Sequence, residues 1–158
     1  MKLIIAEKPC LAKNIIAAIG HKGFQKQDGY FENKDYIVSW AFGHLFSLVD
    51  LEDYCIQDVR EKDRYWTLEG LPFRPAVFRF ELRKDPKTHK VDSNIRKQFD
   101  ILQKLCARND VSHIIHAGDA DREGEIIIRI ILEEAKNHKP VMRLWLPDQT
   151  AETIRSEL

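Results

Sequence analysis

Four acidic residues crowd into residues 117–125, which read AGDADREGE directly after an apolar run. Asp119 and Asp121 are two positions apart, so on an extended segment their side chains point the same way and can converge on one point. Carboxylates held that close repel each other unless a proton or a cation neutralises them. Oxygen ligands alone fit Mg2+, which takes one or two carboxylates together with the phosphate oxygens of a substrate. The segment, which also contains Glu123 and Glu125, therefore predicts a Mg2+ site for a phosphate-bearing ligand.

The same acids have a simpler interpretation. Acidic side chains in the first turn of a helix are stabilised by the helix dipole, by about 0.3–1 kcal/mol each, so this segment could be only a capped helix start. A second feature favours the metal site, because Glu7 and Lys8 follow the first apolar run of the chain. A lysine beside a carboxylate metal site can neutralise the charge that develops in phosphoryl chemistry. A Glu-Lys pair after a strand is also typical of a solvated turn, so both interpretations stay open.

Composition places limits on the class of protein. The chain has 158 residues, 44% of them apolar and 32% charged, which predicts one globular domain over residues 1–158. It contains no apolar run near the roughly 18 residues of a membrane span, and the run at 2–6 is too short for a secretion signal. We therefore expect a cytoplasmic protein with no membrane partner. The three cysteines are far apart, which excludes a disulfide framework and a cysteine zinc site.

Charge is balanced over the whole chain, with 25 Lys and Arg against 25 Asp and Glu. Residues 60–104 are the exception, since they hold twelve basic and seven acidic residues. This stretch is the candidate for a surface that faces phosphate, although an excess of this size is also typical of an ordinary solvated face.

Alternating strand and helix patterns indicate how the acids are positioned. The patterns predict a mainly parallel α/β sheet covered by helices on both faces, with a hairpin at 29–42 and a long irregular excursion over 48–75. The other expected elements are strands at 2–6, 76–83, 111–118 and 141–146, and helices from Pro9 to Gly20, from Asp92 to about Asn109, over 125–135, and from an N-cap at Asp148 to the end.

The carboxyl ends of parallel strands share one edge of a sheet, where ligands of open α/β proteins bind. If the strands at 2–6 and 111–118 are neighbours, Glu7 faces Asp119 and Asp121. Three acids from opposite halves of the chain would then surround one cation.

Four segments together resemble a known family. They are LIIAEKPCLAKNIIAAIG, VSWAFGHLFSL, RYWTLEGLPFRP and IIHAGDADREGEII, and in this order they resemble the Toprim domain of type IA DNA topoisomerases, most closely the topoisomerase III branch. The resemblance implies a Rossmann-like parallel sheet with helices on both sides. It also implies that Glu7, Asp119 and Asp121 hold Mg2+, for which Mn2+ can substitute, and that Glu123 supports the same or a second metal.

The resemblance implies further roles for single residues. Lys8 would contact the scissile phosphate, Glu7 would take part in proton transfer, and Trp66 would contact single-stranded DNA. A place in the core is an equally good interpretation of Trp66. His44 belongs to the matching GHL segment, but we favour a histidine satisfied by a backbone group. His116 is expected to be a hydrogen-bonded structural residue.

Type IA enzymes cut one DNA strand with a tyrosine in a separate domain, and no tyrosine here matches that motif. We therefore expect residues 1–158 to be a fragment that does not relax DNA alone and that works with downstream domains carrying the tyrosine. Two alternatives stay open: a metal-dependent Toprim nuclease or primase, and a noncatalytic DNA-binding module.

Overall fold

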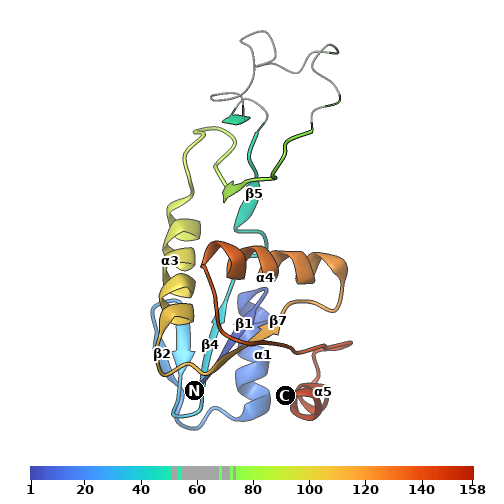
Figure 1. Cartoon of the computed structure of the whole chain (residues 1–158). Helices are drawn as coiled ribbons and strands as arrows, with labels where there is room; N and C mark the ends of the chain where they lie inside the picture. The colour runs from blue at the N-terminus through green and yellow to red at the C-terminus, as the bar shows by residue number, and fades with distance from the viewer. Residues whose placement is uncertain (51–52, 55–67, 69–71, 73) are drawn as a thin grey trace.

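A six-stranded sheet in the order β2-β3-β4-β1-β7-β8 forms the centre of the protein (Figure 1). The structure is a computed structural model that describes residues 1–50, 53–54, 68, 72 and 74–158. Strands β4, β1, β7 and β8 run parallel, and β2 and β3 are antiparallel additions at one edge. The mainly parallel sheet expected from the sequence is confirmed. The bounds are β1 Lys2–Ala6, β2 Gln25–Gln27, β3 Tyr30–Glu32, β4 Tyr36–Trp40, β7 His113–Ala117 and β8 Val141–Arg143.

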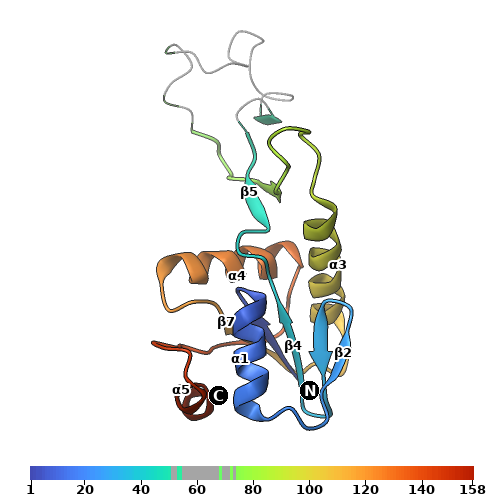
Figure 2. The same cartoon turned by 180° about the vertical axis from the view of Figure 1, so that it is seen from behind.

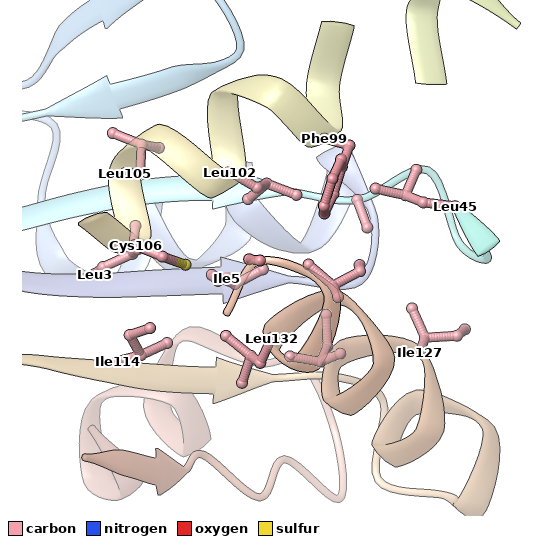
Figure 3. Packing of buried hydrophobic residues seen from close by; sticks show 14 of the residues in the cluster. Leu3, Ile5, Leu45, Phe99, Leu102, Leu105, Cys106, Ile114, Ile127 and Leu132 are labelled. Carbon is pink, nitrogen blue, oxygen red and sulfur yellow. The ribbon is translucent and has the colours of Figure 1, made fainter. Parts of the chain in front are cut away.

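Helices cover both faces of this sheet, as predicted (Figures 1 and 2). Alternation along β1 divides the core, because Ile4 and Ala6 pack with one helix pair and Leu3 and Ile5 with the other. Figure 3 shows the second side, where residues of α3 and α4 lie on the same side of β1 and β7. The first pair is α1 Pro9–Ile19 and α5 Ala151–Glu157, and the second is α3 Ser93–Ala107 and α4 Arg122–Glu134.

The helix predicted from Asp92 is confirmed, and local chemistry explains its start. Asp92 is the N-cap of α3, and its carboxylate accepts hydrogen bonds from the N–H groups of Asn94 and Ile95. The apolar stripe expected along this helix is buried in full; it consists of Ile95, Phe99, Leu102 and Leu105.

The predicted hairpin is confirmed as β3 and β4. Its turn is fixed by Asn33, whose Oδ1 accepts from the N–H groups of Asp35 and Tyr36 at 2.9 and 2.7 Å. The third antiparallel strand, β2, was not predicted. Its sequence QKQ is exposed at every position, so it carries no apolar alternation that could mark a strand.

The prediction of one strand over 76–83 is wrong in its bounds, and the strand that forms there does not join the six-stranded sheet. Only β6, Phe80–Leu82, is a strand, and it pairs with the unpredicted β5, Phe46–Leu48, in a separate two-stranded sheet. Val77 and Phe78 are exposed and precede the paired residues of β6. Most of the excursion predicted at 48–75 lies outside the described residues, and β5 includes its first residue.

Two expectations near the end of the chain need correction. Strand β8 ends at Arg143, three residues earlier than predicted, and α5 is capped by Thr150. Asp148 instead accepts hydrogen bonds from the N–H and Oγ1 of Thr150, so it shapes the turn that precedes the cap. Within the part of the chain that the structure describes, no helix is long and apolar enough to cross a membrane.

Candidate metal and phosphate site

The candidate site lies where the path of the chain reverses across the sheet. Strands β1 and β7 are parallel neighbours, with Ala6 paired to Ala117 at their carboxyl ends. Strand β1 leads into α1 on one face and β7 leads towards α4 on the other. In open α/β sheets, such a reversal creates the crevice in which ligands bind. The loops that carry Glu7 and Asp119 leave the sheet at this point.

Glu7, Lys8 and Asp119 meet in this crevice, as the sequence predicted. Glu7 is only 4% exposed, and its Oε2 accepts a hydrogen bond from the N–H of Asp119 at 3.0 Å. The Nζ of Lys8 lies 2.9 Å from Glu7 Oε1 and 2.9 Å from Asp119 Oδ2. Side chains more than a hundred positions apart in the sequence thus form one hydrogen-bonded group.

Lys8 supplies the positive charge that two adjacent carboxylates need. Its hydrogen bonds to Glu7 and then to Asp119 raise the pKa of its amine above the usual range. The amine therefore stays charged at physiological pH. About half of the Lys8 side chain is exposed, so this cation can be approached from solvent.

Asp121 lies in the same loop but has a different partner. Its Oδ1 accepts the N–H of Gly124 at 2.7 Å, which makes Asp121 the N-cap of α4. The helix therefore begins at Arg122, three residues before the predicted start. The helix-cap interpretation is confirmed for Asp121, whose Oδ2 has no hydrogen bond to any residue that the structure describes.

Two glycines allow this loop and helix to touch. A Cβ on Gly124 would lie 2.5 Å from both N and O of Asp119 and 2.9 Å from Glu7 Oε2. A Cβ on Gly118 would lie 2.3 Å from the carbonyl oxygen of Gly124. Because the shortest of these contacts are with backbone atoms, a side chain at either position would force the backbone to shift. The glycines that bracket the acidic segment therefore let α4 approach the crevice.

Glu123 has a partner different from those of the other acids. Its side chain is 75% exposed, and its Oε2 lies 3.0 Å from Nε2 of His44. His44 follows Gly43, whose N–H donates to the carbonyl oxygen of Glu7 at 3.1 Å. The loop after β4 thus joins the same edge of the sheet. Among the described residues, the partner of His44 is a carboxylate, so the backbone partner expected for it is wrong.

Arg143 organises the acidic loop, and the sequence did not reveal this role. Its guanidinium donates to the carbonyl oxygens of His116, Gly118 and Asp119 at 3.2, 2.9 and 2.8 Å. Its Nε donates to Glu125 at 2.9 Å, which ties the start of α4 to β8. The available signal was a single arginine inside the otherwise apolar run VMRLWL.

His116 is a structural residue, as predicted. Its Nδ1 accepts from the N–H of Gly118 at 3.2 Å, and its Nε2 lies 3.3 Å from the carbonyl oxygen of Glu125. Burial lowers the pKa of this imidazole, and the nearby Arg143 lowers it further. The neutral ring is therefore the form that this fold stabilises.

The arrangement suits phosphate chemistry, but it is not a completed metal cage. The described residues contain no group of three His, Cys, Asp or Glu side chains placed to hold a metal ion. Glu7 and Asp119 are oxygen donors at one point, and Asp121 adds a further oxygen on the same loop. Trp66, which the sequence assigned to DNA contact, lies outside the described residues.

Comparison with known proteins fits this geometry. The model of the Toprim domain family matches residues 2–148. The chain belongs to the Toprim family. The Toprim chain is 41% identical over 153 residues to DNA topoisomerase 3 of Staphylococcus saprophyticus, 39% to that of Bacillus cereus and 42% to that of Staphylococcus aureus. Each match covers 97% of this chain and 19% of the relative, so the chain spans about a fifth of the length of these proteins.

Proposed function

We propose that this Toprim chain, residues 1–158, is one domain of a type IA DNA topoisomerase that binds Mg2+ and cuts and rejoins one strand of DNA. The observation that carries the proposal is the meeting of buried Glu7 with Asp119 at the β1–β7 crevice, with Lys8 hydrogen-bonded to both. The relatives named DNA topoisomerase 3 support the choice of DNA as substrate. The cytoplasmic location expected from the sequence stays a prediction.

The ligands proposed for Mg2+ are Glu7, Asp119 and Asp121, with Glu123 in support and Mn2+ as a possible substitute. Their donor atoms fit, since Mg2+ prefers oxygen ligands and usually keeps part of its coordination for water and phosphate. When bound, the ion would supply positive charge that stabilises the phosphate as its negative charge develops.

Lys8 and Glu7 have separate tasks in the proposed reaction. The half-exposed amine of Lys8 is a charged donor at the mouth of the crevice, where it would bind the scissile phosphate and stabilise its transition state. Glu7 would accept the proton that the attacking tyrosine hydroxyl releases and pass it to the leaving 3′ oxygen, because its buried carboxylate is fixed by the N–H of Asp119. Trp66 would stack on a base of the single strand. The attacking tyrosine would come from another part of the enzyme.

Titration of Mg2+ into the chain, followed by calorimetry, tests the metal site. Asp119→Asn combined with Asp121→Asn removes two of the proposed oxygen charges and should abolish Mg2+ binding. Asparagine is as good an N-cap as aspartate, so α4 should keep its start. Glu133→Gln with Glu134→Gln removes the same charge from the far end of α4 and serves as the matched control.

Unchanged Mg2+ affinity in the Asp119/Asp121 variant would remove these residues from the metal site. Nicking of DNA by the isolated chain with Mg2+ would instead favour the nuclease alternative. Binding of single strands that is equal with and without Mg2+, together with no metal affinity, would favour a noncatalytic DNA-binding module.

A further inference from the structure

A pocket beside the candidate site has no role in the function proposed above. It has a volume of about 460 Å3, within the range of roughly 300–1,000 Å3 for small-ligand sites. Its walls come from the β2–β3 turn, the end of β4 and the loop after it, the residue after β6, and the first half of α3. Its lining includes Phe42, Arg83, Asn94, Ile95 and Gln98.

The floor of this pocket is held by hydrogen bonds and close packing. Gln98 is only 4% exposed, and its Nε2 donates to the carbonyl oxygens of Gly29 and Trp40 at 3.1 and 2.7 Å and lies 3.2 Å from Ser39 Oγ. Gly29 has a φ of +79°, and a Cβ there would lie 2.6 Å from Ile101 and 2.7 Å from Gln98 Oε1. The close packing of these groups fixes the pocket before any ligand arrives.

The chemistry of the walls favours a flat and uncharged ligand. Phe42 is 42% exposed and Ile95 adds apolar surface, so an aromatic ring can be covered there. The charged groups largely satisfy one another, because Lys97 pairs with Asp28 at 2.8 Å and the Asp92 carboxylate caps α3. The two carboxylates of the lining, Asp28 and Asp92, equal its two cations in number, so the walls carry no net positive charge that would favour a phosphate.

Two polar side chains remain available to recognise such a ligand. The guanidinium of Arg83 and the side-chain amide of Asn94 make no hydrogen bond within the described part of the chain. An amide offers both a donor and an acceptor, and a guanidinium offers paired donors, which match the edges of nucleobases.

The pocket adjoins the acidic crevice through one short loop. Phe42 lies between Ala41, whose N–H donates to the carbonyl oxygen of Ala6 at 2.8 Å, and Gly43, whose N–H donates to that of Glu7 at 3.1 Å. The aromatic wall and the proposed catalytic carboxylate are thus held on adjacent parallel strands. A nucleic-acid strand with a phosphate at Lys8 that follows the carboxyl edge of the sheet towards β4 would pass Phe42, because β4 is the neighbour of β1.

We propose that this pocket binds one base of single-stranded DNA, next to the phosphate held by Lys8, with Phe42 as the stacking surface and Arg83 and Asn94 on the base edge. The proposal rests on the proposed function, because it assumes a strand in the crevice. A single strand is required, since the faces and edges of bases in a duplex are already stacked and paired.

Binding of labelled single-stranded oligonucleotides to the chain, measured by fluorescence anisotropy, tests this pocket. Phe42→Ala should weaken binding about 5- to 150-fold, the loss expected for one stacked base, and Phe42→Tyr should restore it. A series of strands with one abasic nucleotide at each position in turn should show one position where the wild type loses affinity. The Phe42→Ala variant should bind this abasic strand and the intact strand with equal affinity. The variant has already lost the contact that the missing base would make.

Met142→Ala is the control, since this exposed residue lies on β8 at the opposite edge of the sheet. If Phe42→Ala binds the strand with wild-type affinity while Lys8→Ala binds it more weakly, the proposal that the pocket binds a base is wrong. The proposed function is then unaffected. If Phe42→Ala fails to fold, the abasic series on the wild type decides, and equal affinity for every strand overturns the proposal. Failure of the wild type to bind any strand would overturn both, and Mg2+ titration would then test the metal site alone.

Discussion

At the scale of single residues, each acid at the crevice is distinguished by its partner. Glu7 is buried and accepts a peptide N–H, Asp119 faces the amine of Lys8, and Asp121 caps a helix. These partners preorganise the carboxylates, because each is fixed by a backbone or side-chain donor before a ligand is present. Among the described residues, His44 is the only partner of the exposed Glu123, so Glu123 is the most adaptable of the four acids.

Substitution of Gly124 tests how closely α4 approaches the crevice. Gly124→Ala in a helix usually stabilises a protein by about 0.5–1 kcal/mol. Here we expect the opposite, a loss of about 1–3 kcal/mol in the free energy of unfolding, because the new Cβ would press on the backbone of Asp119. Urea unfolding followed by circular dichroism measures the change. Gln103→Ala, at an exposed position of α3, should change stability by less than about 0.5 kcal/mol, and a stabilised Gly124→Ala would contradict the close approach.

His116 should give the fold a specific pH dependence. Its pKa is lowered from the ordinary 6.5, so above that pH the imidazole is neutral in both folded and unfolded chains. As the pH falls below 6.5 the unfolded chain takes up the proton first, and stability decreases until the folded pKa is passed. Between about pH 7.5 and pH 5.5 the wild type should therefore lose more stability than His116→Gln. Urea unfolding at each pH gives both curves, and parallel curves would show that the burial of His116 has no such effect.

At the scale of elements, the crevice depends on segments that follow each of the four parallel strands. The segments after β1 and β7 bring the acids, the loop after β4 brings His44, and Gln149 after β8 lies 3.5 Å from Asp119. Arg143 at the end of β8 joins them, since one planar guanidinium can donate to several carbonyl oxygens at once. The shape of the acidic loop is therefore set by a strand that carries none of the acids.

Replacement of Arg143 by lysine separates geometry from charge. Arg143→Lys keeps the positive charge but takes away the guanidinium donors of the Gly118 and Asp119 carbonyl oxygens, each at a cost of about 1–3 kcal/mol. We expect a loss of about 2 kcal/mol or more in unfolding free energy, measured in urea, together with weaker Mg2+ binding. Arg129 contacts the same Glu125 but is 73% exposed, so Arg129→Lys should cost less than about 1 kcal/mol. Equal losses in the two variants would mean that the contacts of Arg143 with the loop contribute little.

Sequence patterns identified the elements whose residues act locally. The Leu102 stripe and the Asn33 turn were predictable because helix periodicity and side-chain turns depend on near neighbours. The meeting of Glu7 and Asp119 was predicted on the condition that their strands are neighbours, and the pairing of β1 with β7 meets this condition. By contrast, β5 and β6 are short and depend on pairing with each other, so they leave no local pattern. The hydrogen bonds of Arg143 to the carbonyl oxygens of the acidic loop and His116 span 24 to 27 positions, so they leave none either.

At the scale of the whole molecule, the site lies at the carboxyl edge of a sheet whose central strand is largely buried. Fully buried Leu3, Ile4 and Ile5 place β1 between the two helix layers, so the carboxyl end that carries Glu7 is rigidly held. The opposite side of the crevice faces solvent through Lys8. Under the proposed function, this exposed side is where the part of the enzyme that carries the tyrosine would meet a DNA strand bound in the crevice.

Joining this chain to the part of the Staphylococcus aureus relative that it does not match tests the assembled enzyme. If the chain supplies the metal site and the remainder supplies the tyrosine, the joined protein should relax supercoiled DNA with Mg2+, and the 158-residue chain alone should not. Glu7→Gln in the joined protein should slow relaxation about a hundredfold or more, the usual contribution of proton transfer by a positioned group. Glu133→Gln should leave the rate unchanged, because that residue lies at the far end of α4. Since activity of the unmodified joined protein shows that it is folded, relaxation by Glu7→Gln at the same rate would exclude Glu7 from the chemical step.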